Sequence, residues 1–186
     1  VPQGPSTVDG VDFAVYLAGR CKPVGYDIAD DVERVFDLRE SRAVESEFEA
    51  RVLGSGTAVS GTPVSAAHAL GMMENALGDA YAGVGTIHLS PLTATILLGD
   101  QLIVQVGGKF FTHLGTKVVI GTGYDSTAMY GTGDVTIYRS TKVNVESPGM
   151  DTNTVNVLVE RAYVVAGDCV SLRLAVPPPT QQSSGG

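Results

Sequence analysis

Residues 27–53, DIADDVERVFDLRESRAVESEFEARVL, decide the fold of this chain. The stretch contains neither proline nor glycine, and Gly25 and Gly54 bracket it. Acidic residues crowd its first turn, where the positive end of a helix dipole favours them. Apolar side chains recur with a helical period at Ile28, Val32, Val35, Phe36, Val44, Phe48 and Val52. The stretch therefore predicts an amphipathic helix about 40 Å long, whose apolar stripe must pack against another element.

The composition is that of a globular chain. Its 186 residues are 44% hydrophobic and 17% charged, which allows one domain or two small lobes with a sizeable core. The chain has no run of about 18 apolar residues, so we expect no membrane-spanning segment and no membrane partner. The net charge of −8 argues against binding nucleic acid through a basic face.

The first hundred residues predict helices joined by short strands and a linker. Residues 12–24 alternate loosely and predict a strand that turns at Pro23. Residues 54–62, GSGTAVSGT, predict a flexible linker between two lobes. Thr62 followed by Pro63 is a helix-start signal. The further elements expected here are a helix at 63–77, a strand at 83–89 and a short helix at 91–98, which Ser90 would cap in front of Pro91.

From residue 101 the hydrophobic period changes to two, which predicts strands. Gly107-Gly108 indicates a hairpin between two of them. Residues 121–133, GTGYDSTAMYGTG, have no strong period and predict a loop. Residues 101–106, 109–113 and 116–120 are expected to be strands. Residues 134–145 are expected to form a strand pair or one long strand, broken by Ser147-Pro148-Gly149, and two more strands are expected within 154–176 around Gly167-Asp168. Helices and strands are segregated along the chain, which predicts an α+β fold.

The motifs that would indicate catalysis are missing from the sequence. It contains no phosphate-binding loop, no zinc-ligand spacing and no serine nucleophile elbow. His68, His88 and His113 stand alone, which favours structural roles. Cys21 and Cys169 lie in apolar, strand-like contexts, which favours buried thiols over nucleophiles. We therefore expect a structural protein without catalytic residues, metal or cofactor.

Several segments, in this order, resemble one protein family. They are FAVYLAGRCKPVGYD (13–27), DLRESRAVESEF (37–48), PVSAAHALGMMENALGDAYAGVGTIHLSP (63–91), THLGTKVVIGTGYDST (112–127), GTGDVTIYRSTKVNV (131–145) and NTVNVLVERAYVVAGDCVSL (153–172). Together they resemble the major capsid proteins of actinobacterial tailed phages. Those proteins have the Hong Kong ninety-seven-type shell fold, which encapsulins share.

The resemblance implies a division into domains. A peripheral domain, residues 11–56 and 150–176, would carry the long spine helix, and a mixed α/β axial domain, residues 57–149, would point toward the capsomer axis. Residues 1–10 would be an N-terminal arm and residues 177–186 a flexible tail. The family has a long arm and an extended hairpin before the spine helix. Here about a dozen residues precede Phe13, so we expect a truncated or processed arm, or shell contacts that are built differently.

The resemblance also implies a function. The chain would be a structural subunit of an icosahedral capsid that self-assembles into hexamers and pentamers around the phage genome. It would reside in the virion after assembly in the host bacterial cytoplasm. Its partners would be copies of itself, other capsid, scaffold or portal proteins, and DNA bound without sequence specificity. The candidate subunit contacts are Arg34, Arg39, Arg42 and Arg51 on the long helix, and Tyr124 and Asp125 in the loop at 121–133, near the capsomer axis.

Three alternatives stay open at this level. One is a minor or vertex-specific shell protein of the virion, which copy number per particle would separate from a major one. Another is the shell subunit of an encapsulin-like nanocompartment, which would hold a cargo protein in place of DNA. The third is an enzyme with a cryptic site, which the motif search disfavours.

Overall fold

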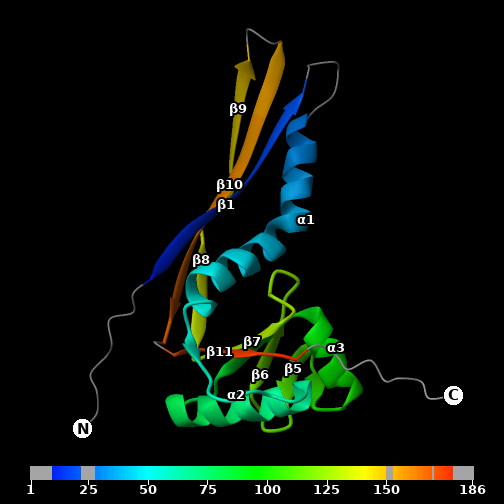
Figure 1. Cartoon of the computed structure of the whole chain (residues 1–186). Helices are drawn as coiled ribbons and strands as arrows, with labels where there is room; N and C mark the ends of the chain where they lie inside the picture. Colours follow the sequence, from blue (N-terminus) through cyan, green and yellow to red (C-terminus); the bar gives the residue numbers. More distant parts are fainter. Residues whose placement is uncertain (1–9, 22–27, 150–152, 169, 178–186) are drawn as a thin grey trace, which may run out of the picture.

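The protein, described here from a computed structural model, consists of an elongated lobe and a compact lobe (Figure 1). The structure describes residues 10–21, 28–149, 153–168 and 170–177. Four predicted features lie outside the described residues: the arm at 1–10 except Gly10, the turn at Pro23, Cys169, and the tail at 177–186 except Pro177. Among the helices described, none is both long and apolar enough to cross a membrane.

The helices lie in the first hundred residues and strands fill the rest of the chain, as expected for the predicted α+β fold. Their bounds are β1 (Val11–Cys21), α1 (Ile28–Phe48), the π-helical turn η1 (Glu49–Leu53), β2 (Thr57–Ala58), α2 (Ala66–Ala80), β3 (Thr86–Leu89), α3 (Pro91–Gly99), β4 (Ile103–Val106), β5 (Lys109–Thr112), β6 (Lys117–Ile120), β7 (Ala128–Thr132), β8 (Val135–Arg139), β9 (Val143–Gly149), β10 (Thr154–Gly167) and β11 (Ser171–Ala175).

The elongated lobe is built around β10. Strand β1 pairs with it antiparallel along its whole length, from Val11 opposite Val165 to Cys21 opposite Val155. The other edge of β10 is shared by β9 and β8, which pair with its first and last parts respectively. The result is a long, narrow sheet of four strands. Among the described residues, α1 covers one face of this sheet, and no other helix lies on the opposite face (Figure 1).

The predicted long helix is confirmed, and it continues from α1 into η1 up to Leu53. Its buried Val32, Phe36 and Phe48 pack with Phe13 and Val15 of β1 in one core cluster. This explains the burial pattern of β1, in which alternate side chains face the helix. Gly19 marks the closest approach, because a Cβ there would overlap the Cγ2 of Val32.

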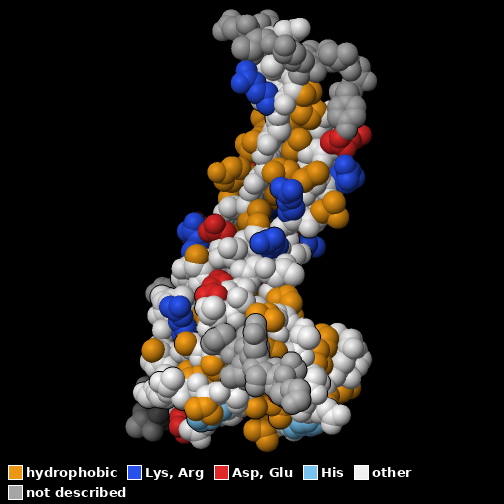
Figure 2. All heavy atoms as spheres, turned by 45° about the vertical axis from the view of Figure 1, so that its right-hand side comes forward, with side chains coloured by type: hydrophobic (Ala, Val, Ile, Leu, Met, Phe, Trp, Pro, Cys, Tyr) orange, Lys and Arg blue, Asp and Glu red, His pale blue; other side chains and the backbone are white. Residues whose placement is uncertain are grey.

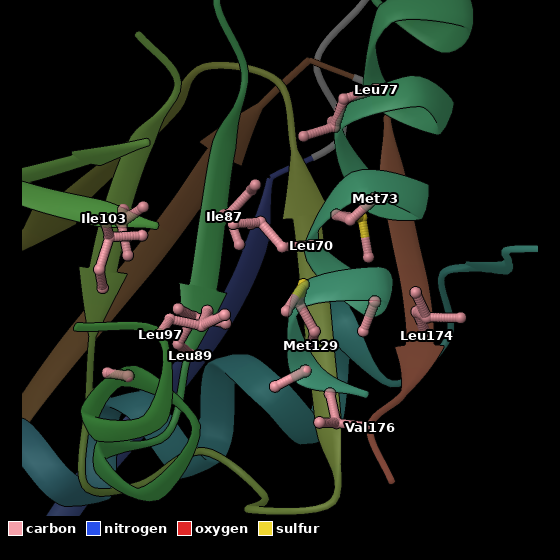
Figure 3. Packing of buried hydrophobic residues seen from close by; sticks show 14 of the residues in the cluster. Leu70, Met73, Leu77, Ile87, Leu89, Leu97, Ile103, Met129, Leu174 and Val176 are labelled. Carbon is pink, nitrogen blue, oxygen red and sulfur yellow. The ribbon is translucent and has the colours of Figure 1, made fainter. Parts of the chain in front are cut away.

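The compact lobe contains a seven-stranded sheet in the order β2-β11-β7-β3-β6-β5-β4. The pairs β2–β11 and β3–β6 are parallel, and the others are antiparallel. Helices α2 and α3 cover one face, and Figure 3 shows their side chains meeting those of the strands. The core of this lobe is one cluster of buried side chains between the helices and the sheet. It includes Leu70 and Met73 of α2, Leu97 of α3, and Ile87 and Met129 of the sheet.

The prediction of a loop over residues 121–133 is wrong in its second half. Residues Ala128–Thr132 form β7, a central strand in which all five residues are buried. Because both faces of β7 are covered, its side chains cannot alternate between apolar and polar, and the period of two disappears. Met129 packs under α2, whereas Tyr130 belongs to the core cluster of the elongated lobe.

The two lobes differ from the predicted division into 11–56 plus 150–176 and 57–149. Strands β8 and β9 lie in the segment assigned to the axial domain, yet both pair with β10 in the elongated lobe. Strand β11 lies in the segment assigned to the peripheral domain, yet it pairs with β2 and β7 in the compact lobe. Backbone hydrogen bonding explains why these strands lie in the other lobe than predicted. The long strand β10 and the buried strand β7 each need a partner strand on both edges.

Smaller differences concern the ends of elements. Helix α2 begins at Ala66, because Ser65 accepts the N–H of His68 as its cap, and not at Pro63. Strand β9 runs through Pro148 to Gly149, where a break was expected. The predicted cap at Ser90 and the predicted hairpin at Gly107-Gly108 are confirmed.

Gly19→Ala should lower the free energy of unfolding by about 1–3 kcal/mol, because the added methyl group must displace the branched Val32 side chain. Chemical denaturation measures the change. Ala18→Ser, one residue earlier and on the uncovered face, is the matched control and should change stability by less than about 0.5 kcal/mol. Equal effects of the two substitutions would contradict the packing of α1 on β1.

Candidate interaction surfaces

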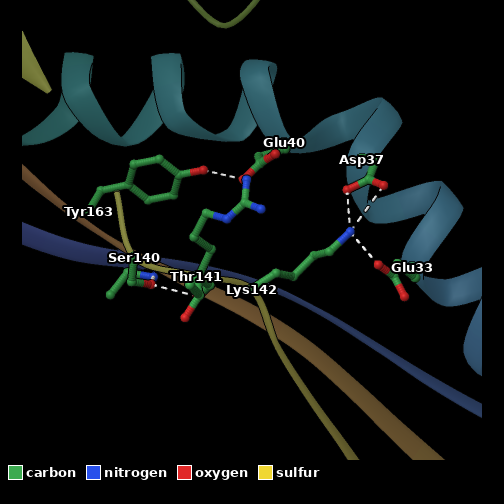
Figure 4. Close-up of polar contacts among 9 residues, drawn as sticks. Glu33, Asp37, Glu40, Ser140, Thr141, Lys142 and Tyr163 are labelled. Carbon is green, nitrogen blue, oxygen red and sulfur yellow. Dashed lines mark hydrogen bonds and ion pairs between the residues drawn. The ribbon is translucent and has the colours of Figure 1, made fainter. Parts of the chain in front are cut away.

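The acidic side chains of α1 are largely engaged inside the chain. Lys142, between β8 and β9, contacts Glu33 at 2.5 Å and Asp37 at 2.8 Å (Figure 4). The hydrogen bond from Lys142 is the main reason that the pKa of Glu33 is lowered. Farther along the helix, Glu40 accepts a hydrogen bond from Arg161 at 2.6 Å and another from the hydroxyl of Tyr163. These contacts tie α1 to the strands beneath it.

Two further carboxylates of the helix join the lobes. Glu45 accepts the backbone N–H of Gly123 at 2.8 Å. Glu49 accepts the N–H of Asp125 at 2.8 Å with one oxygen and the hydroxyl of Tyr130 at 2.6 Å with the other. Burial, followed by the hydrogen bond to Glu49, raises the pKa of Tyr130. The loop before β7 therefore lies against α1 and η1 at the junction between the lobes.

His88 lies at the centre of this junction. Its Nδ1 is 3.3 Å from the hydroxyl of Tyr124, and its Nε2 is 3.0 Å from Oγ1 of Thr132. The rings of Phe48 and Tyr124 meet it edge-on, with centroids 5.5 and 5.6 Å away. Burial lowers the pKa of His88 to about 4. The imidazole is therefore neutral at pH 7 and acts as a structural bridge, as the sequence indicated.

The structure separates the six predicted contact residues into three kinds. Arg34 and Arg51 form exposed ion pairs within α1 and η1, with Asp31 at 3.1 Å and with Glu47 at 2.8 Å respectively. Tyr124 and Asp125 are the second kind, because each is engaged within its own chain. The side chain of Tyr124 is buried in the core, so its prediction as a contact with a neighbouring subunit is corrected. The carboxylate of Asp125 accepts hydrogen bonds from the backbone and hydroxyl of Thr127.

Arg39 and Arg42 form the third kind. Both are exposed, and neither has an ion-pair partner among the residues that the structure describes. Leu38, beside them, is 74% exposed. Leu38 and Arg42 are one helical turn apart on the side of α1 away from the sheet. These residues are the part of the predicted site that stays available for contact with another molecule.

A set of exposed apolar side chains was not predicted from the sequence. Figure 2 shows hydrophobic side chains at the surface of both lobes. In the compact lobe they are Val64, Val84, Leu92, Leu98, Val106, Leu114 and Val119, and on the elongated lobe Tyr16, Leu38, Ile137, Tyr138, Val143, Val145 and Val164. Apolar residues at consecutive positions of β8 and β10 were the available signal, because one face of a sheet needs only alternate ones. Exposed apolar surface of this extent is typical of proteins that form interfaces.

Charge is also distributed unevenly. Within residues 57–133 the charged side chains are few: Glu74, Asp79, Asp100, Lys109, Lys117 and Asp125. Depletion of charge together with exposed apolar side chains is the composition expected at the centre of protein–protein interfaces. The charges of the chain are concentrated on α1 and η1 instead.

The described residues offer little for catalysis. Among them, no three His, Cys, Asp or Glu side chains converge to hold a metal ion. A cavity of about 270 Å³ at the junction is lined mainly by aliphatic residues such as Val52, Val165 and Val170. Arg51 reaches this cavity but is already paired with Glu47.

Comparison with known proteins is informative about the fold of the chain. No protein-family model and no curated protein sequence matches the chain. Among solved structures, a chain of Mycobacterium phage Che8 is similar with a TM-score of 0.56 and 12% identity, over 90% of this chain and 70% of that one. The capsid of a native GTA particle gives a TM-score of 0.59 and 12% identity, over 92% and 74%.

The third likeness is to an encapsulin. The holo-SrpI encapsulin complex from Synechococcus elongatus PCC 7942 gives a TM-score of 0.60 and 12% identity, over 96% of this chain and 77% of that one. Phage, GTA and encapsulin shells share the Hong Kong ninety-seven-type architecture, and this chain has the same α+β fold. The expected fold class is thereby confirmed.

Tyr130→Phe should destabilise the protein by about 1.5 kcal/mol, because it removes a hydrogen bond to the charged carboxylate of Glu49. Urea unfolding at pH 7 provides the measurement. Tyr138→Phe is the matched control, since Tyr138 is 62% exposed, and it should leave the unfolding curve unchanged. An unchanged unfolding curve for Tyr130→Phe would show that the hydrogen bond between Tyr130 and Glu49 does not stabilise the fold.

The stability of the protein should fall on acidification because of His88. Its folded pKa is about 4, below the usual value of 6.5, so the unfolded state binds the proton first as the pH drops. The stability that neutral His88 contributes to the folded state is fully present above pH 6.5 and is lost as the pH falls toward 4. Between pH 7 and pH 5 the loss from this residue should be about 2 kcal/mol.

Urea unfolding at the two pH values would measure this loss in the wild type and in His88→Gln. The variant should have a lower stability at pH 7 but a smaller dependence on pH. An identical pH dependence in both proteins would show that His88 is not the titrating group.

Proposed function

We propose that this chain is a structural subunit of an icosahedral viral capsid and that many copies form hexamers and pentamers around a phage genome. The observation that carries the proposal is the similarity of nearly the whole described fold to phage and GTA shell chains. The role is assembly and not catalysis. The subunit would reside in the virion, after assembly in the cytoplasm of a bacterial host.

The lobes correspond to the two domains of such a shell protein. The elongated lobe, with α1 as its spine, would be the peripheral domain, and the compact lobe would be the axial domain. The exposed apolar residues on both lobes support contacts at several places on each subunit. Weak contacts repeated in a closed symmetric assembly give high collective stability.

The charge of the chain suits a container for DNA. A net charge of −8 gives no broad basic surface to hold the packaged duplex. DNA would therefore be enclosed without sequence-specific binding. Scaffold, portal and other capsid proteins are the further partners of this role.

A second candidate is the shell of an encapsulin-like nanocompartment. The likeness to the Synechococcus encapsulin complex favours it. Both candidates require self-assembly and differ in contents, because one shell encloses DNA and the other encloses protein cargo. A minor or vertex-specific shell protein would differ from a major one in having fewer copies per particle.

Negative-stain electron microscopy and mass measurement of the purified chain test the proposal. We expect closed particles, or rings whose masses are five and six times the 19.3 kDa subunit mass. Nuclease-protected DNA in particles from infected cells would support a capsid, whereas small DNA-free particles with a protein inside would support a nanocompartment. A monodisperse monomer at all concentrations up to about 1 mM would contradict both candidates. Its self-association would then have a dissociation constant above about 1 mM, which is too weak to hold a shell together.

A further inference from the structure

The elongated lobe has two chemically different faces on opposite sides. One is the outer side of α1, which carries Leu38, Arg39 and Arg42, here called the α1 ridge. The other is the face of the four-stranded sheet away from α1, here called the open sheet face, with Asp12, Tyr16, Val143 and Glu160. Because the sheet separates the two faces, residues of one cannot reach residues of the other within a single chain.

The α1 ridge is basic with an apolar centre. Leu38 is 74% exposed. The acidic side chains around the ridge are engaged elsewhere, for example Asp31 with Arg34 and Glu45 with the N–H of Gly123. Arg39 and Arg42 are left as exposed cations, without an ion-pair partner in the part of the chain that the structure describes.

The open sheet face is apolar, with Glu160 at its centre, Asp12 toward one end and Arg20 toward the other. Tyr16 is 69% exposed and Val143 is 52% exposed. Glu160 pairs with both of them in the sheet, so the three side chains lie together on this face. Asp12 is exposed four residues before Tyr16 on the same face. Within the described residues, neither acid forms an ion pair.

The two faces also match along the length of the lobe. Lys142 contacts Asp37 and directly precedes Val143, so Leu38 lies at the level of Val143, Tyr16 and Glu160. Glu40 contacts Tyr163, which pairs with Phe13, so Arg42 lies near the level of Asp12. Two lobes stacked in parallel would therefore bring Leu38 against Tyr16 and Val143, and the arginines against Glu160 and Asp12.

We infer that the α1 ridge of one copy docks on the open sheet face of the next copy. This inference rests on the proposed function, in which copies surround a common axis. A contact between two different faces of identical chains is heterologous, and such contacts close into rings when the rotation permits. Opposite charges at matching levels select this pairing over ridge against ridge or face against face, which would bring like charges together.

Charge reversal on each face tests the inference. The ridge variant carries Arg39→Glu and Arg42→Glu, and the face variant carries Asp12→Arg and Glu160→Arg. Each alone should assemble at least about tenfold less than the wild type, a loss that corresponds to one lost contact of modest strength. An equimolar mixture of the two should again form six-membered rings, in which the variants alternate and each reversed ridge meets a reversed face. A five-membered ring cannot alternate in this way, so the readout is the mass of the hexameric ring.

Arg139→Glu is the matched control, because it reverses an exposed charge on the same lobe outside both faces, and it should assemble like the wild type. Circular dichroism melts confirm that each variant is folded. If Glu160→Arg prevents folding, the pair Arg42→Glu and Asp12→Arg replaces the fuller variants in the same mixing experiment.

The outcomes separate this inference from the proposed function. A wild type that never assembles overturns both. A wild type that assembles together with ridge and face variants that assemble equally well overturns the inference alone. Variants that fail singly and are not rescued by mixing also overturn it, because the ridge would then meet some other surface. Rescue in the mixture supports the contact between copies.

Discussion

The hydrogen-bonding requirement of β10 organises the whole molecule. A strand of fourteen residues presents backbone donors and acceptors on two edges, and both edges must find partners. One edge is filled by β1 from the start of the chain, and the other by β9 and β8 from the segment just before β10. The chain therefore crosses between the lobes three times, after Leu53, after Thr132 and after Gly167. Helix α1 then covers the single sheet face that its apolar stripe requires.

Much of the fold could be predicted because many of its elements are determined by residues close together in the sequence. The long helix, the cap at Ser90 and the hairpin at Gly107-Gly108 each depend on neighbouring residues only. Strand β7 could not be found in this way, because its burial on both faces removes the alternation that identifies a strand. The exchange of β8, β9 and β11 between the lobes was also out of reach, since strand pairing depends on residues far apart in the sequence.

The candidate site was predictable as a set of residues but not as a geometry. All four arginines of the long helix look alike in the sequence, and only the fold shows that Arg34 and Arg51 have partners. Tyr124 follows glycines in a stretch that reads as a loop, yet it packs beside His88. The polar contacts of α1 use its acidic residues to fix the tertiary structure, which leaves an excess of positive charge on its outer side. Interaction surfaces of this kind arise from what the fold leaves unpaired.

The three crossings have a mechanical consequence. In antiparallel pairs the hydrogen bonds run perpendicular to the strands, and β1 and β10 lie along the length of the elongated lobe (Figure 1). A pull along that axis loads the eleven paired positions of these strands in shear, all at once, whereas a sideways pull would peel them apart one by one. Tension between the lobes is shared by three covalent connections in parallel. The elongated lobe should therefore resist tension along its long axis more strongly than tension across it.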